Sequence, residues 1–279
     1  MKKIHWYSIV IAMIFAFVTV GSAIAVDFRV GTGTKKGVYT KAGKQLKVQT
    51  NGSDVNTVIV LGKGTKDNLK KMKNGELDGA FVQPEGLLDA GVDFEVVTLF
   101  HPEYVHLITL KDGPKSIKDF DPKKDTIAIG SNGGGTALTW ANFIVQDPGY
   151  KPMATIPLSG ARALAKLESG EITGILRVCG LKDGDIMRAN KVKDKFKLSL
   201  VDDWDFNDKV AGKEIYEFVK IDDDVYPNLI SGWSLKTIRM QTHLIASVSW
   251  MDAHPDEFEE LYDAAAKAVP NVLKLVVND

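Results

Sequence analysis

Short apolar runs alternate with longer amphipathic segments along most of the chain. DFRV (27–30), GAFVQ (79–83), TIAI (126–129) and GILRV (174–178) are four such runs, and each begins with or is followed by a glycine. Runs of this length are typical of strands, and the amphipathic segments between them are typical of helices. The alternation therefore predicts an α/β fold.

A helix-ending pattern occurs twice, at an offset of 95 residues. Residues 69–79 read LKKMKNGELDG and residues 164–174 read LAKLESGEITG. In each copy, a glycine follows a lysine-containing amphipathic stretch and a short apolar run begins a few residues later. This pattern predicts a helix that stops at a glycine, followed by a new strand.

Two glycine-rich loops repeat at a similar offset. GTGTKKG (31–37) follows the run at 27–30, and GSNGGGT (130–136) follows the run at 126–129. The two repeats together predict two lobes of similar α/β build. In open α/β sheets, ligands bind beyond the carboxyl ends of the strands, where helix N-termini supply N–H groups that favour an anion. We therefore predict a cleft between the lobes that holds a negatively charged group.

Other readings of these glycines are weaker. The dinucleotide fingerprint requires a third glycine one position before Gly37, and a P-loop requires a Gly-Lys-Ser/Thr that is missing here. No G-x-S-x-G elbow is present. The acidic run VDDWDFND (201–208) lacks the glycine and the distal glutamate of an EF-hand loop. We expect no cofactor, no metal and no catalytic group.

A few single residues have two interpretations. Arg177 lies within an apolar run, where it either pairs with an acidic residue or meets an anionic ligand. Tyr39 follows the first glycine loop and is either a packed aromatic or a ring that lines the cleft. His101 and His106 share one predicted strand and point to opposite faces, which is unsuited to a shared metal.

The first residues have the layout of a secretory signal peptide. Lys2 and Lys3 form a positive start, residues 8–20 an apolar core, and residues 23–25 (AIA) a small-residue cleavage motif. The apolar core is shorter than the stretch of about 20 residues that spans a bilayer, so we prefer cleavage after Ala25 to a permanent anchor. This interpretation predicts an exported protein.

Composition adds little to this picture. Removing residues 1–25 with their two lysines leaves 254 of the 279 residues and takes the net charge from −1 to −3. This mildly acidic balance gives no sign of a nucleic-acid partner. Cys179 is the only cysteine and has no internal partner, so we expect a buried, inert thiol.

Five segments together resemble the TAXI family, the solute-binding receptors of one branch of the TRAP transporters. They are VGTGTKKGVYTKAG (30–43), NLKKMKNGELDGAFVQ (68–83), LFHPEYVHLI (99–108), KSIKDF (115–120) and IAIGSNGGGTAL (127–138). The segments occur in the family's order, and the resemblance extends from about residue 28 to residue 180. FEELYDAAAKAV (258–269) fits a terminal helix.

The resemblance implies a two-lobed periplasmic binding protein, a "Venus flytrap" with two strands that cross at the hinge. It implies a non-enzymatic receptor that binds glutamate, a dicarboxylate or a keto acid and delivers it to a TRAP membrane permease. We expect a monomer in which residues 26–110 and 229–279 form lobe one and residues 111–228 form lobe two, with the crossing near residues 104–110 and 230–238.

Positions in the matching segments, Thr65 just before the second of them, and Arg177 give the predicted ligand-binding residues. They are Thr32, Gly33, Tyr39, Thr65, Gln83, Ser131, Gly134, Gly135, Thr136 and Arg177. Two other functions remain open at this point. An enzyme on the same fold would bring Glu103, His106 and Arg177 together around the ligand, and a sensing or scaffold module would have the fold without transport.

Overall fold

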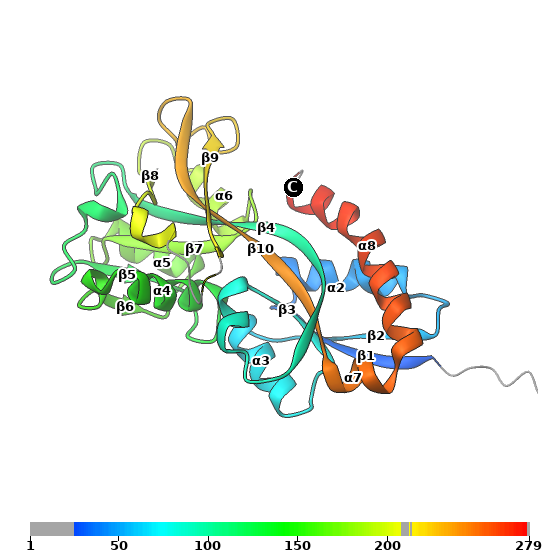
Figure 1. Cartoon of the computed structure of the whole chain (residues 1–279). Coiled ribbons are helices and arrows are strands. Elements are labelled where there is room, and N and C mark those ends of the chain that lie inside the picture. Colours follow the sequence, from blue (N-terminus) through cyan, green and yellow to red (C-terminus); the bar gives the residue numbers. More distant parts are fainter. Residues whose placement is uncertain (1–24, 208–211, 213, 278–279) are drawn as a thin grey trace, which may run out of the picture.

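One twisted sheet of ten strands connects the two lobes of the molecule (Figure 1). The computed structural model describes residues 25–207, 212 and 214–277. The main path of the sheet runs β2-β1-β3-β10-β4-β7-β5-β6, and β8 pairs with β4 while β9 pairs with β10. The predicted α/β class is confirmed.

Lobe one is built around parallel strands β1, β2 and β3, and lobe two around parallel strands β5, β6 and β7. The order in lobe one is β2-β1-β3-β10, and the order in lobe two is β6-β5-β7-β4. The two lobes therefore repeat one plan in opposite directions along the sheet. The strands are β1 (Val26–Gly31), β2 (Val55–Val60), β3 (Gly79–Val82), β5 (Thr126–Ala128), β6 (Ala154–Ile156), β7 (Gly174–Cys179) and β8 (Phe196–Ser199).

Helices α2 to α6 connect these strands within each lobe, and α7 and α8 follow β10. Lobe one contains α2 (Val38–Gln49), α3 (Thr65–Lys73), α7 (Val248–Ala253) and α8 (Pro255–Val277), and lobe two contains α4 (Gly135–Gln146), α5 (Gly160–Glu168) and α6 (Gly184–Asn190). Short 3₁₀ helices are η1 (Pro84–Asp89), η2 (Ile117–Asp119), η3 (Pro148–Tyr150) and η4 (Trp204–Asn207).

Two long strands, β4 (Phe94–Leu110) and β10 (Ser234–Ser247), run from one lobe into the other and pair antiparallel. The first half of β4 contributes Phe100 to the core of lobe one, and its second half contributes Val105 to the core of lobe two. Strand β9 (Glu217–Asp222) extends the lobe-two end of β10. The residue boundaries predicted for the two lobes stay a prediction.

The repeated helix-ending pattern is confirmed in both copies. Helix α3 is followed by Gly75 at φ 70°, and α5 is followed by Gly170 at φ 75°, a left-handed conformation that favours glycine. Strands β3 and β7 then begin at Gly79 and Gly174. Both glycine loops also lie where expected, between β1 and α2 and between β5 and α4.

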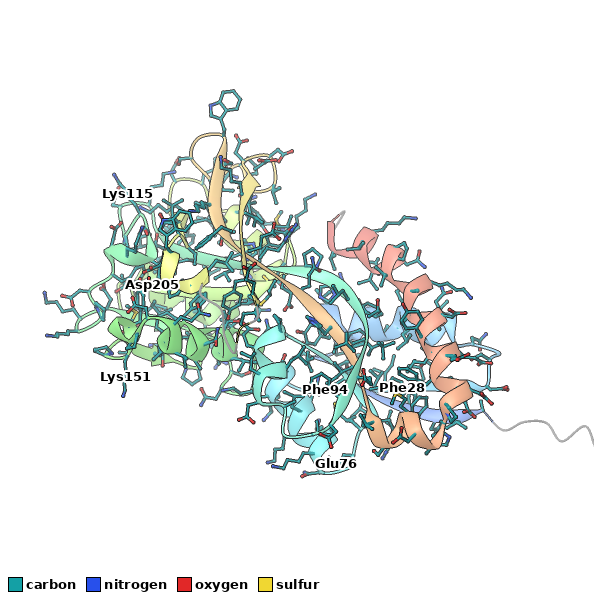
Figure 2. All side chains as sticks on the ribbon, in the orientation of Figure 1. Phe28, Glu76, Phe94, Lys115, Lys151 and Asp205 are labelled. Atoms are coloured by element: carbon teal, nitrogen blue, oxygen red, sulfur yellow. The ribbon has the colours of Figure 1, made fainter. Side chains whose placement is uncertain are left out.

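The terminal helix predicted at residues 258–269 forms part of α8. Helix α8 packs its Leu261 and Ala265 into the core that contains Phe28. In Figure 2, Phe28 lies in the interior of lobe one, whereas Glu76, Lys115 and Lys151 lie at the periphery. The C-terminal chain therefore completes the lobe that the N-terminal strands begin.

The predicted signal peptide lies outside the described residues, except for its last residue, Ala25. Among the helices of residues 25–207 and 214–277, none combines the length and the apolar character needed to cross a membrane.

Candidate functional site: a cleft between the lobes

Both glycine loops face one cleft between the lobes, with a volume of about 420 Å³. Lobe one contributes the loop before α2 and the end of β3, and lobe two contributes the loop before α4 and the end of β7. The carboxyl ends of the central strands of both lobes therefore meet at this cleft, as expected for α/β ligand sites.

The cleft brings together most of the predicted ligand-binding residues. Those that line it are Gly33, Tyr39, Gln83, Ser131, Gly134, Gly135, Thr136 and Arg177. They come from four elements that are distant in sequence, so the fold places them together as the repeat predicts. Their role in binding stays a prediction.

Thr32 and Thr65 lie inside lobe one and do not line the cleft; both are fully buried. The Thr32 hydroxyl donates to the Val60 carbonyl at 3.0 Å. The Thr65 hydroxyl accepts the Gln83 backbone N–H at 3.0 Å. These two threonines hold the loop and the end of β3 in place. The prediction that they face the ligand is not supported by their positions.

Helices α2 and α4 both begin at the cleft without a side-chain cap. Their N-cap residues are Gly37 and Gly134, and neither helix has an acidic residue in its first turn. The first-turn N–H groups of such helices have no intrahelical partner and favour an anion. Tyr39 and Thr136 place these first turns at the cleft wall.

Glu103, on β4, is the carboxylate at the base of the cleft and is only 6% exposed. Its Oε2 accepts hydrogen bonds from Gln83 Nε2 at 2.8 Å and from the Tyr39 hydroxyl at 3.3 Å. Burial raises the pKa of Glu103 to about 7, opposed by the Gln83 hydrogen bond and reinforced by the nearby Glu85. Tyr39 is thus both a packed ring and part of the cleft wall.

Arg177, on β7, satisfies part of each interpretation. Its Nη2 lies 3.5 Å from Asp183 Oδ2, which makes an ion pair, and the residue lines the cleft. Its Nε is buried and has no partner among the described residues. Burial lowers the pKa of Arg177, but its interactions with the neighbouring Cys179, Asp183 and Asp185 outweigh this and leave the pKa above its ordinary value.

The charged side chains of the cleft are mixed in sign. Lys63 and Arg177 supply positive charge, and Glu103, Asp183 and Asp185 supply negative charge. Sequence reasoning missed Lys63 and Asp183, which lie on loops, and Asp185, which lies in the first turn of α6; none of them belongs to a recognisable pattern. Glu103 was named from the sequence only for the enzyme alternative and not as a residue of the binding cleft.

The two lobes touch across the cleft. A methyl group on Gly135 would lie 2.3 Å from Gln83 Oε1, and a methyl group on Gly64 would lie 3.4 Å from the Gly135 nitrogen. The β-carbon of Lys63 would lie 3.6 Å from a methyl group on Gly133. These contacts join α3 and β3 of lobe one to the α4 loop of lobe two, so the structure is in a closed arrangement.

His106 does not line the cleft. Its ring is fully buried and contacts the Tyr104 carbonyl and the Tyr226 hydroxyl at 3.0 and 3.1 Å. Burial lowers its pKa to about 4. Of the three residues named for the enzyme alternative, Glu103 and Arg177 line the cleft and His106 does not.

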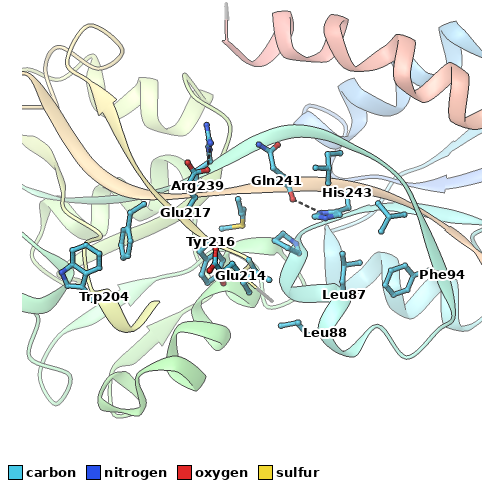
Figure 3. A pocket seen from close by; sticks show the side chains of 16 residues that line it. Leu87, Leu88, Phe94, Trp204, Glu214, Tyr216, Glu217, Arg239, Gln241 and His243 are labelled. Carbon is cyan, nitrogen blue, oxygen red and sulfur yellow. Dashed lines mark hydrogen bonds and ion pairs between the residues drawn. The ribbon is translucent and has the colours of Figure 1, made fainter. Parts of the chain in front are cut away.

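A larger cavity of about 790 Å³ lies away from the glycine loops, along the crossing strands (Figure 3). Its walls are mostly apolar and include Leu87, Phe94 and Trp204, with an Arg239–Glu217 ion pair at one side. None of the predicted ligand-binding residues lines it. Cys179 lies at the other cavity, the cleft, as a free and buried thiol, and burial raises its pKa well above its ordinary value.

Comparisons with known proteins agree with this architecture. The model of the NMT1-like family matches residues 19–253. Among solved structures, the GluR0 ligand-binding core from Nostoc punctiforme in complex with (L)-glutamate is 9% identical with a TM-score of 0.53, and the match covers 90% of this chain and 100% of that one. No curated protein sequence matches the chain.

Two further structures have the same fold. A mutant of ArgBP from T. maritima is 10% identical with a TM-score of 0.53 and covers 91% of this chain and 96% of that one. The periplasmic aliphatic sulphonate binding protein SsuA from Escherichia coli is 12% identical with a TM-score of 0.52 and covers 87% and 72%. These likenesses establish the two-lobed binding-protein fold that the sequence predicted.

Proposed function

The chain belongs to the NMT1-like family and has the two-lobed binding-protein fold, and on that basis we propose that it is an extracytoplasmic solute receptor. The receptor binds a small organic anion in the cleft between its lobes and delivers it to a membrane permease. The single observation that supports this most is that two uncapped helix ends from opposite lobes meet in one closed cleft. The protein acts by binding and performs no chemistry on its ligand.

Closure is the mechanism of this receptor. A ligand that contacts both lobes stabilises the closed arrangement in proportion to its differential affinity for the closed and open forms. Arg177 and the α4 N-terminus contact the ligand from lobe two. Tyr39 and Gln83 contact it from lobe one.

The charge balance of the cleft favours a ligand that carries both signs. A dicarboxylate would bring two negative charges to a cleft that already holds Glu103, Asp183 and Asp185 against Lys63 and Arg177. Burying charge without a partner is costly. An amino acid such as glutamate places its ammonium group near Glu103 and a carboxylate at the helix ends. We therefore rank glutamate above dicarboxylates and keto acids.

The transport system we propose is of the TRAP type, with this chain as a TAXI-class receptor. Support comes from the five ordered segments between residues 30 and 138 that resemble that family. Receptors of several transport systems share this fold, so an assay of ligand uptake by cells is needed to distinguish a TRAP permease from other transporters. Collapsing the ion gradient in cells that express the chain natively stops uptake by a TRAP permease, whereas uptake that responds only to ATP depletion contradicts the TRAP assignment.

Thermal unfolding of residues 26–279 against a ligand panel tests the receptor function. Glutamate and 2-oxoglutarate form a matched pair, because they differ only in an amino or a keto group at one carbon. A ligand at about 100 times its dissociation constant adds roughly 2.7 kcal/mol to the free energy of unfolding. We expect glutamate to raise the melting temperature more than 2-oxoglutarate.

Matched variants localise the binding. Arg177→Ala should weaken binding by about 2 kcal/mol or more, because it removes a charge-assisted contact. Arg162→Ala removes an exposed arginine from the same lobe and should leave the affinity unchanged. A larger shift with 2-oxoglutarate would reverse the ligand ranking. No shift with any amino acid or organic acid would contradict the receptor function proposed here.

A further inference from the structure

Glu85 of lobe one reaches across to lobe two. It lies in η1, directly after β3, and is only 5% exposed. Its Oε1 accepts a hydrogen bond from the Thr139 hydroxyl on α4 at 2.6 Å and another from the Tyr216 hydroxyl at 2.7 Å. Tyr216 belongs to the segment that leads into β9, and its side chain is labelled at the wall of the larger cavity in Figure 3.

The contact is part of a polar bridge between the lobes. Asn142, on α4, donates from Nδ2 to the Tyr216 hydroxyl at 3.0 Å, so α4, η1 and the approach to β9 share one network. The neighbouring backbone is tightly enclosed, because a methyl group on Gly86 would lie 2.5 Å from Thr65 and 3.8 Å from Leu138 on α4. Separating the lobes would withdraw α4 and admit water to the Glu85 carboxyl.

The surroundings of Glu85 favour its neutral form. Its Oε2 is buried and has no partner among the described residues. A neutral carboxyl suits this arrangement, since its carbonyl oxygen can accept both hydroxyls, whereas a carboxylate would be buried without a compensating cation. Burial raises the pKa of Glu85, and the hydrogen bonds from Thr139 and Tyr216 oppose this only in part.

Among the described residues, no cation on the elements packed around Glu85 neutralises it. Helix α4 has no charged side chain. On β10, Arg239 pairs with Glu217 beside Tyr216, and burial lowers the pKa of His243. On β4, Glu103 is itself a buried acid and supplies no cation. On α3, the side chains of Lys66, Lys70 and Lys73 are exposed, and Lys71 pairs with Asp67.

We infer that Glu85 is a latch that holds the cleft closed in its protonated form, so that closing the lobes takes up a proton. This regulation rests on the proposed receptor function, because it acts on the same cleft. In the open form water reaches Glu85 and its pKa returns to the ordinary value of a glutamate. Above that ordinary value the closed form binds more protons than the open form does, so the closed fraction falls as pH rises.

Small-angle scattering of the ligand-free chain (residues 26–279) measures closure without any ligand. The reference for the closed state is the double variant Lys63→Cys with Gly133→Cys, oxidised to a disulfide. The 3.6 Å separation of these β-carbon positions lies within the range of about 3.5–4.5 Å that a disulfide spans. The radius of gyration is compared with this reference at about pH 5 and about pH 8.

The wild-type chain should match the locked reference at the lower pH and expand at the higher pH. For each pH unit by which closure raises the pKa of Glu85, the ratio of closed to open chains falls about tenfold between these two pH values. Glu85→Gln mimics the neutral acid and should stay near the locked dimension at both values. Glu76→Gln, an exposed change in the same lobe, should keep the wild-type response.

Glu85→Ala tests whether the hydrogen bonds of Glu85 hold the lobes closed. It removes both hydrogen bonds, so we expect an expanded chain at both pH values. A wild type that stays closed throughout, or a Glu85→Gln variant that expands with pH as the wild type does, overturns the latch. Both readings are made without ligand, so they stand apart from the ligand panel, whose failure would contradict the receptor function alone.

Discussion

The two lobes share one plan but contact each other through different chemistry. In the sequence repeat, Glu85 after β3 is equivalent to Gly180 after β7. Glu85 makes a polar contact with α4 of lobe two. A methyl group on Gly180 would lie 3.5 Å from the side chain of Val276 on α8, which belongs to lobe one. The same position in the repeat thus forms a titratable contact on one side and a close apolar contact on the other.

The glycine loops differ in the same way. In lobe one, the Thr40 hydroxyl donates to the Thr34 carbonyl at 2.9 Å and to the Thr32 hydroxyl at 3.1 Å, so the loop is held by its own side chains. In lobe two, the Thr136 hydroxyl accepts the Val178 N–H at 3.0 Å, so the helix start is tied to β7. A shared scaffold can therefore present unlike surfaces on the two sides of the cleft.

The equivalent strand glycines give the largest expected difference between the lobes. A methyl group on Gly79 would lie 2.4 Å from the Ile245 carbonyl oxygen, a backbone atom, whereas one on Gly174 would lie 2.9 Å from the Phe120 ring. Side chains can shift more easily than paired backbone. We expect Gly79→Ala to cost about 4 kcal/mol and Gly174→Ala about 2 kcal/mol, measured by urea unfolding.

Equal losses for the two variants would mean that the strands of lobe one tolerate crowding as well as those of lobe two do. Gly133→Ala is a suitable control, because the nearest atom to its added methyl group is 3.6 Å away. That change should have little effect on the free energy of unfolding.

Glu103 predicts a pH effect that arises at the crossing strands. Its pKa is raised from 4.5 to about 7 in the folded chain, so the folded chain binds more protons than the unfolded chain between these values. The free energy of unfolding should therefore fall as pH rises through this window, by about 3 kcal/mol at most. Glu103→Gln should remove most of this slope, measured by urea unfolding from about pH 5 to about pH 8.

Glu85 adds a slope of the same sign, so a residual pH effect in Glu103→Gln is expected. Glu95→Gln, on the same strand but at an exposed position, should leave the slope unchanged. A free energy of unfolding that rises over this pH range would show that Glu103 gains a partner on ionisation that offsets its burial.

The fold could be predicted from the sequence because its signals are local. Gly75 and Gly170 end their helices through a backbone conformation that glycine adopts easily, and the repeat at a fixed offset reveals the second lobe. The crossing strands were predicted as a pair, although the sequence does not reveal that β10 lies between β3 and β4. That order depends on long-range pairing.

The site was harder to predict, because the direction of a side chain depends on its partners. Thr32 and Thr65 stand beside cleft residues in the sequence but turn inward to satisfy backbone groups in lobe one. Asp183 enters the cleft because Arg177 attracts it and because the loop before α6 turns there. Neither contact leaves a pattern along the chain.

The smallest expected effect is a loss of unfolding free energy that should be the same in the two lobes. Gly75 and Gly170 end equivalent helices, both at positive φ, and a methyl group on either would meet no atom within 4 Å. The cost of Gly75→Ala and of Gly170→Ala is therefore the backbone cost alone, about 1 kcal/mol each. Urea unfolding should give the two variants the same loss. Because crowding is absent at both positions, a clear difference would mean that the two lobes do not contribute equally to the unfolding transition.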